Sequence, residues 1–228
     1  MEAVLIVVAI VAVGIGAALI SHHLDRKRRR ELAGMARQLE LSFSEVDTQG
    51  CGALPFVLLR KGDGRGTENV MSGVWQDVPL REFDHWYYEE STDSKGHRTK
   101  TYYRFSCAVV EIEATCSALT IDREGFFTRL ADAIGLDDIT FELEEFNQAF
   151  NVKSKDRRFA SDLLDQRMMR FLLGTDRAFE FEIAGRWLLC FSKRRRPTEL
   201  IPLLGTLKGF LEHVPPVVFS LYGPDGSR

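Results

Sequence analysis

The sequence predicts an α+β protein in which an N-terminal transmembrane helix precedes a mostly antiparallel sheet domain with three or four helices. Three observations lead to this prediction. Residues 3–20 are all apolar or glycine, residues 21–37 hold six Lys/Arg against two acids, and every Phe, Trp and Tyr lies beyond residue 37. The 228 residues have a net charge of −3 and are 45% hydrophobic. Such a composition excludes a disordered, collagen-like or disulfide-dense chain.

The apolar run of residues 3–20 predicts a membrane anchor. As a helix it would extend about 27 Å, close to the roughly 30 Å hydrocarbon core of a bilayer. A cleaved signal peptide is the alternative, but it needs positive charge before the apolar run. Here Glu2 precedes the run and the cations follow it. Because positive charge stays in the cytoplasm, we expect an uncleaved, single-pass signal-anchor in the cell (inner) membrane, with the N-terminus outside and residues 21–228 cytoplasmic.

The cations that follow the apolar run predict contact with the membrane surface. Anionic head groups attract Lys and Arg that lie next to a bilayer. The predicted contact residues are Arg26, Lys27, Arg28, Arg29 and Arg30. The alternative is that these residues only set the topology.

The expected partners follow from the same segment. They are the lipid bilayer, anionic lipid and an unidentified protein. The pairs Ala12/Gly16 and Gly14/Ala18 have the spacing that lets two helices approach closely, which predicts a homodimer through the transmembrane helix. Nucleic acid is not expected, because the chain beyond residue 37 is acidic overall.

Four parts are expected along the chain: an anchor (1–22), a basic collar with a juxtamembrane helix (23–41), a cytoplasmic α+β domain (42–214) and a C-terminal tail (215–228). Residues 54–59, 68–90 and 100–121 are rich in Val, Thr and aromatic residues, which is typical of strands. Turn-forming residues separate these blocks at 62–66 and 91–97. In the third block the apolar face changes at residues 109–110, which predicts a bulge or a strand that changes layers.

Helices alternate with strands in the second half of the chain. Helices are predicted over 122–135, from Asp156 with a restart at Asp165 to Gly174, and over 197–214, where Pro202 must lie in the first turn. Residues 139–143 predict a strand. Residues 179–183 and 187–191 predict two more, joined by a tight turn at Ala184-Gly185.

No sequence motif assigns a catalytic, cofactor or metal residue, and no cofactor is expected. The four cysteines form no Cys-x-x-Cys pair, and the glycines at 62, 64 and 66 lack the Lys-Ser/Thr of a phosphate loop. Cys51 could act as a nucleophile only if His85, His97 or His213 folded onto it. Residues 193–196 (Lys-Arg-Arg-Arg) predict a solvated turn, with anionic lipid contact as the alternative.

Several stretches resemble a family of bacterial single-pass membrane-anchored proteins of unknown function. They are 69–73 (Asn-Val-Met-Ser-Gly), 82–87 (Glu-Phe-Asp-His-Trp-Tyr), 101–103 (Thr-Tyr-Tyr), 138–141 (Asp-Ile-Thr-Phe), 145–147 (Glu-Phe-Asn), 150–152 (Phe-Asn-Val) and 155–156 (Lys-Asp). The similarity covers roughly residues 35–212 and implies no activity. One departure is the segment before Asp122, which lacks the proline such relatives often have there.

The sequence therefore favours a membrane-anchored cytoplasmic binding or interaction module of unknown biochemical role. The alternative is a membrane-tethered, hydrolase-like enzyme that uses Cys51 or a His/acid constellation assembled only in the fold. A deep cleft with converging polar groups would favour the enzyme, and sheet faces filled by side chains would favour the binding module.

Overall fold

The computed structural model describes residues 1–123 and 135–224; within the first helix, the side chains of residues 2–15, 17, 18 and 21 are outside this description. A seven-stranded antiparallel sheet forms the body, with strand order β1-β2-β3-β4-β6-β5 and β7 also paired with β4. The strands are β1 (Ser42–Val46), β2 (Gly64–Trp75), β3 (Val78–Thr92), β4 (Arg98–Asp122), β5 (Asp137–Ile139), β6 (Asn151–Ser154) and β7 (Glu180–Lys193).

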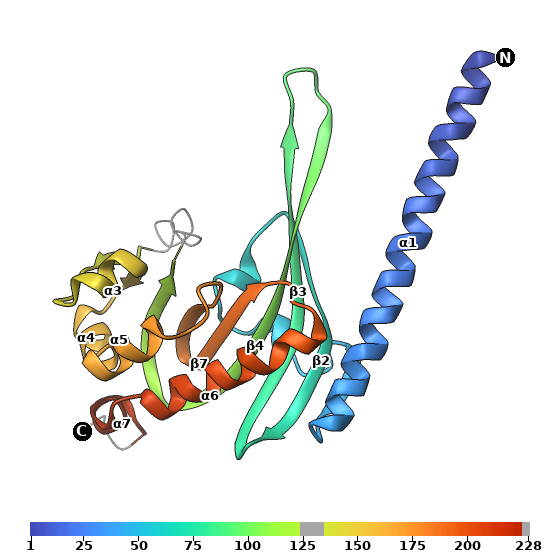
Figure 1. Cartoon of the computed structure of the whole chain (residues 1–228). Coiled ribbons are helices and arrows are strands. Elements are labelled where there is room, and N and C mark those ends of the chain that lie inside the picture. Colours follow the sequence, from blue (N-terminus) through green and yellow to red (C-terminus); the bar gives the residue numbers. More distant parts are fainter. Residues whose placement is uncertain (124–134, 225–228) are drawn as a thin grey trace.

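The described α-helices are α1 (Glu2–Gln38), α3 (Glu144–Ala149), α4 (Arg157–Leu163), α5 (Gln166–Leu173), α6 (Leu200–His213) and α7 (Pro216–Tyr222). Short 3₁₀ helices lie at Cys51–Ala53, Leu58–Arg60 and Pro197–Glu199. Helix α1 is long and only its C-terminal part lies against the sheet, while the β3–β4 hairpin projects as an arm (Figure 1).

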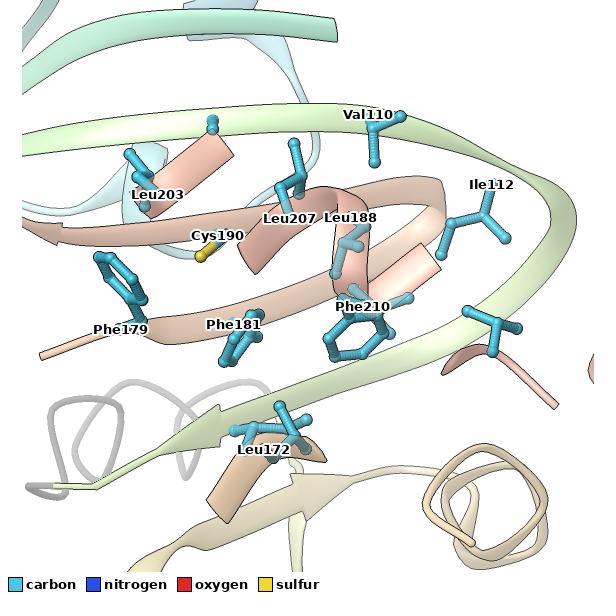
Figure 2. Packing of buried hydrophobic residues seen from close by; sticks show 14 of the residues in the cluster. Val110, Ile112, Leu172, Phe179, Phe181, Leu188, Cys190, Leu203, Leu207 and Phe210 are labelled. Carbon is cyan, nitrogen blue, oxygen red and sulfur yellow. The ribbon is translucent and has the colours of Figure 1, made fainter. Parts of the chain in front are cut away.

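Two hydrophobic clusters lie on opposite faces of the central strands. On the first face, which we call the helix face, α1 packs on β1 and β2, and α6 packs on β4 and β7. Phe181 of β7 lies against Phe210 of α6, with ring centroids 5.2 Å apart (Figure 2). On the second, the loop face, residues 51–59 cover Phe83, Cys107 and Leu189. Both faces are therefore filled by side chains.

The expected transmembrane anchor over residues 1–22 is corrected by the structure. Within the described part of the chain, no helix is long and apolar enough to cross a membrane. The reason lies in α1, whose described side chains include charged residues from Asp25 onward, while those of residues 2–15 lie outside the description. The single-pass, signal-anchor interpretation is therefore wrong, and the predicted orientation loses its support with it. The antiparallel sheet with several helices agrees with the prediction.

Several local predictions are confirmed. The side chain of Asp156 accepts a hydrogen bond from the Phe159 amide at 3.0 Å, and that of Asp165 accepts one from the Met168 amide at 2.8 Å, so both cap helices as expected. Pro202 lies in the first turn of α6. Residues 93–97 connect β3 and β4 as expected.

Other local predictions are wrong. The irregularity predicted at residues 109–110 is not found there, because Val109 and Val110 are buried on opposite faces in regular pairing, and the register of β4 with β7 shifts only between Glu111 and Leu119. Residues 180–193 form one strand rather than two, because Gly185, at a φ of +61°, makes an irregularity within the pairing instead of a turn. Residues 54–59 include a 3₁₀ turn instead of a strand. Of the strand predicted over 139–143, only Ile139 is in a strand, because β5 (Asp137–Ile139), which pairs with β6, ends there. The helix predicted over 122–135 falls mainly on residues 124–134, outside the described residues.

Candidate functional site

Two basic clusters that are far apart in the sequence meet where α1 leaves the sheet. Arg28 of α1 donates a hydrogen bond from Nη1 to the carbonyl oxygen of Arg195, at 2.6 Å. The Nη2 atom of Arg194 lies 3.8 Å from a carboxylate oxygen of Asp25. Lys27 lines one groove with Arg194, Arg195 and Arg196, and Arg26, Arg29 and Arg30 line another beside Phe43 and Glu45. We call this set of neighbouring cations the basic surface. It comprises Arg26, Lys27, Arg29, Arg30, Lys193, Arg194, Arg195 and Arg196.

Arg28 does not belong to this surface, because its side chain points into the protein. It donates two hydrogen bonds to the Asp84 carboxylate, from Nε at 2.7 Å and from Nη2 at 2.6 Å. The two side chains are only 10% and 4% exposed. Burial opposes the charge of Arg28, but the hydrogen bonds and charge of Asp84 outweigh it and raise the pKa of the guanidinium. Such two-pronged pairing fixes geometry as well as charge, so Arg28 docks α1 on the helix face.

Further polar groups surround this ion pair. Asn69 of β2 donates from Nδ2 to Asp84 at 2.9 Å, and Ser106 of β4 lies 3.4 Å from Arg28 Nη2. Glu82, two residues before Asp84 on β3, is fully buried, and neither carboxylate oxygen has a hydrogen-bond partner among the described residues. Burial, with the Asp84 charge added, raises its pKa well above the usual range. This environment therefore favours the protonated form of Glu82.

A groove of about 800 Å³ lies between α1 and residues 194–201. One face of α1 lines it over about four turns, and the chain entering α6 lines the other side. Five cationic side chains and one acid are among the lining residues. The apolar lining comes from Leu24, Met35, Leu39, Pro197 and Ile201. A groove of this size, with an apolar lining and a few charged groups, is typical of small-molecule sites.

The predicted membrane-contact residues occupy different environments. Arg26, Lys27 and Arg30 are exposed, whereas Arg29 is half-buried and lies 3.1 Å from Glu45. Their contact with a membrane stays a prediction, and Arg28 is not available for it. Sequence reasoning missed the partner of Arg28, which is Asp84. The sequence did contain a signal for this pair. An acid lies within residues 82–87, in a segment expected to form part of the sheet, and a buried charge requires a partner.

The environment of Cys51, the candidate nucleophile, disfavours the reactive thiolate form of its side chain. Cys51 is buried, and burial together with the negative charge of Asp47 raises its pKa to about 12. His85 lies on the loop face, where its Nδ1 is 3.2 Å from the Thr67 hydroxyl. Burial, with the positive charge of Arg65 added, lowers the pKa of His85 to about 4. Since nucleophilic cysteines need a lowered pKa, this part of the molecule does not support the enzyme alternative.

Two other predictions concern groups of side chains. Cys107 belongs to the cluster on the loop face and Cys116 to that on the helix face, so the two thiols lie on opposite sides of the sheet. Among the described residues, no group of three or more His, Cys, Asp and Glu is arranged to hold a metal ion. The small-residue pairs proposed for a homodimer fall mostly on side chains outside the described part of α1, so that prediction stays untested.

Comparisons with known proteins give one informative result. No protein-family model and no curated protein matches the chain. The fold is similar to the crystal structure of the mycobacterial trehalose monomycolate transport factor A, TtfA, with a TM-score of 0.57 and 13% sequence identity. The similarity covers 82% of this chain and 94% of that one, and it concerns the fold alone. The resemblance to bacterial membrane-anchored proteins of unknown function stays a prediction.

Proposed function

We propose that this protein is a membrane-associated binding module that docks on anionic lipid through the basic surface. The observation that supports this most is the meeting of residues 26–30 with residues 193–196. A single basic turn is usually only solvated, but two clusters brought together concentrate positive charge on one region of an otherwise acidic protein. Each Lys or Arg near an anionic leaflet contributes about 1 kcal/mol.

Exposed apolar side chains adjoin these cations. On α1, Leu19, Ile20 and Leu24 are 64%, 63% and 56% exposed. Apolar groups beside Lys and Arg are the composition of helices that lie in the interfacial layer of a membrane. The fold is also similar to that of a transport factor, and we extend to this chain only the idea of a binding role in transport at a membrane. The deep burial of Cys51 gives no comparable support to catalysis.

Vesicle flotation of the full chain tests this proposal. The parent should bind anionic vesicles better than neutral ones, and the difference should shrink at high salt because the Debye length falls to about 3 Å at 1 M. The test variant carries R26Q, R30Q and K193Q, three exposed positions outside the apolar groove. Its preference for anionic vesicles should fall by at least tenfold.

A matched control removes three exposed cations elsewhere, at Lys155, Arg157 and Arg158 around the start of α4. This variant should bind as the parent does. Equal binding of the parent to anionic and neutral vesicles would contradict the proposal. An equal loss in the test and control variants would also contradict it, because net charge rather than the basic surface would then govern binding.

A further inference from the structure

The groove beside α1 shares Lys27, Arg194, Arg195 and Arg196 with the basic surface and combines them with an apolar lining. Its α1 side presents Lys27 and Arg28 near one end, and Gly34, Met35 and Leu39 two to three turns further on. The span from Leu24 to Leu39 is about 22 Å along the helix, at roughly 1.5 Å per residue. The groove is thus elongated, and its positive charge is concentrated toward the N-terminal part of the α1 lining.

Each of the five cations that line the groove has a carboxylate within 4 Å, Lys27 pairing with Glu31 of the groove itself, but the carboxylates nearest Arg194 do not reach hydrogen-bond distance. Arg194 is 22% exposed, and its two nearest carboxylates, on Asp84 and Asp25, lie 3.7 and 3.8 Å away, beyond hydrogen-bond distance. Asp84 is already engaged by Arg28 and Asn69. Burial lowers the pKa of Arg194, and the opposing effect of the Asp84 charge only partly offsets this. An anion beside Arg194 would accept the charge-assisted hydrogen bonds that this side chain does not make to either carboxylate.

We propose that this groove binds a single anionic amphiphile, whose anionic head lies against Arg194 and Lys27 and whose alkyl chain lies along Met35, Leu39 and Ile201. The reason is charge complementarity at one end combined with apolar lining at the other. The site deepens the proposed function, because an anionic membrane would be the source of the ligand. The proposed ligand is an anionic group on one alkyl chain. The alternative ligand, which the test must distinguish from it, is a free anion.

Gly34 offers a direct way to fill the groove. A Cβ added at this residue would meet no atom within 4 Å, and the residue lines the groove within α1. Leucine is a better helix former than glycine, so G34L should block the groove without unfolding the helix. Gly205 on α6 provides the matched control, since it is exposed, helical and free of contacts within 4 Å, but lies outside the groove.

Calorimetric titration of the full chain with dodecyl phosphate, below its micelle concentration, tests the site. Inorganic phosphate and dodecyl maltoside are the comparison probes. We expect saturable binding of one dodecyl phosphate, at least tenfold tighter than either comparison probe. G34L should weaken this binding at least tenfold and G205L should not change it. A second groove variant, I201D, should also weaken it, and its residue is 41% exposed, so the fold tolerates the change.

Three outcomes would overturn the site. One is equal binding of dodecyl phosphate by G34L, I201D and the parent, because the groove would then not be occupied. Equal affinity for dodecyl maltoside would show that the site does not require an anion. Equal affinity for inorganic phosphate would show that it does not require an alkyl chain. Failure of the proposed function is separable from these. The R26Q/R30Q/K193Q variant should lose anionic-vesicle binding yet retain dodecyl phosphate, whereas G34L should show the reverse.

Discussion

The two faces of the central sheet both bury ionisable groups, but they neutralise them differently. On the helix face, the Asp84 carboxylate pairs with the guanidinium of Arg28 of α1. On the loop face, Glu182 of β7 accepts hydrogen bonds from the backbone amides of Val57 and Leu58. Burial raises the pKa of Glu182 to about 8. The comparison shows that charge holds α1 in place, whereas backbone hydrogen bonds hold the 51–60 segment.

The largest expected effect comes from removing one charge of the helix-face pair. D84A should lower the free energy of unfolding by about 3–5 kcal/mol, because Arg28 would be left buried without its counter-charge. Denaturant unfolding measures this loss. The double variant R28M/D84L should recover most of it, since an apolar pair removes both charges together.

A matched control is E45A, which removes the partner of Arg29 in an exposed pair with side chains 35% and 60% exposed. Its effect should stay below about 1 kcal/mol. If D84A lowered the free energy of unfolding as little as E45A does, the proposed contrast between the buried and the exposed ion pair would be wrong.

On the loop face, stability should depend on pH in a direction set by Glu182. Its folded pKa of about 8 lies above its ordinary value, so the folded state holds the proton more tightly. This stabilisation is present at low pH and is lost as pH rises from about 4.5 to 8, by about 5 kcal/mol. Unfolding of the parent and E182Q across this range should show a steeper decline for the parent. Parallel profiles would refute this assignment.

His85 should produce a smaller effect of opposite sign. Burial lowers its pKa to about 4, so the unfolded state binds the proton more tightly. The corresponding stability is present above about pH 6.5 and is lost as pH falls toward 4, by about 3 kcal/mol. Replacement by Gln should flatten the acid side of the stability profile. An unchanged acid limb in H85Q would show that His85 is not responsible.

The smallest expected change concerns the groove. G34L should leave the unfolding free energy unchanged or raise it by up to about 1 kcal/mol, because leucine favours the helix and no atom opposes the new side chain. A thermal unfolding scan of G34L beside G205L checks this. A clear drop in midpoint for G34L alone would mean that the groove is narrower than its lining indicates.

Sequence patterns predicted those parts of the fold that depend on neighbouring residues. The caps at Asp156 and Asp165 and the position of Pro202 follow from local hydrogen bonding and the missing proline amide. The change of apolar face at residues 109–110 wrongly predicted an irregularity there, because both faces of the sheet are buried at this point and the pairing shifts only after Glu111. A tight turn at Gly185 was not distinguishable from an irregularity within a strand, since glycine allows a positive φ in either case.

The site depended on contacts between distant segments, which spacing alone does not reveal. The cations at 26–30 were found, but nothing local separates Arg28, which is buried, from Lys27, which is exposed. Helical geometry places neighbouring residues about 100° apart, so a run of five necessarily faces several directions. Only the contact between Arg28 and Asp84 in the structure shows which side of α1 faces the sheet. The apolar run of residues 3–20 was the strongest sequence signal and still led to the wrong conclusion about a membrane span.

The most direct test of the account is whether the two basic clusters act as one surface. Flotation with anionic and neutral vesicles, at several salt concentrations, should compare R26Q/R30Q, K193Q/R196Q and the combined variant. We predict that each pair weakens anionic binding, that their effects add, and that the combined variant has lost most of its salt dependence. If the combined variant binds anionic vesicles as tightly and as salt-sensitively as the parent, the basic surface is not the membrane-binding site and the central claim is contradicted.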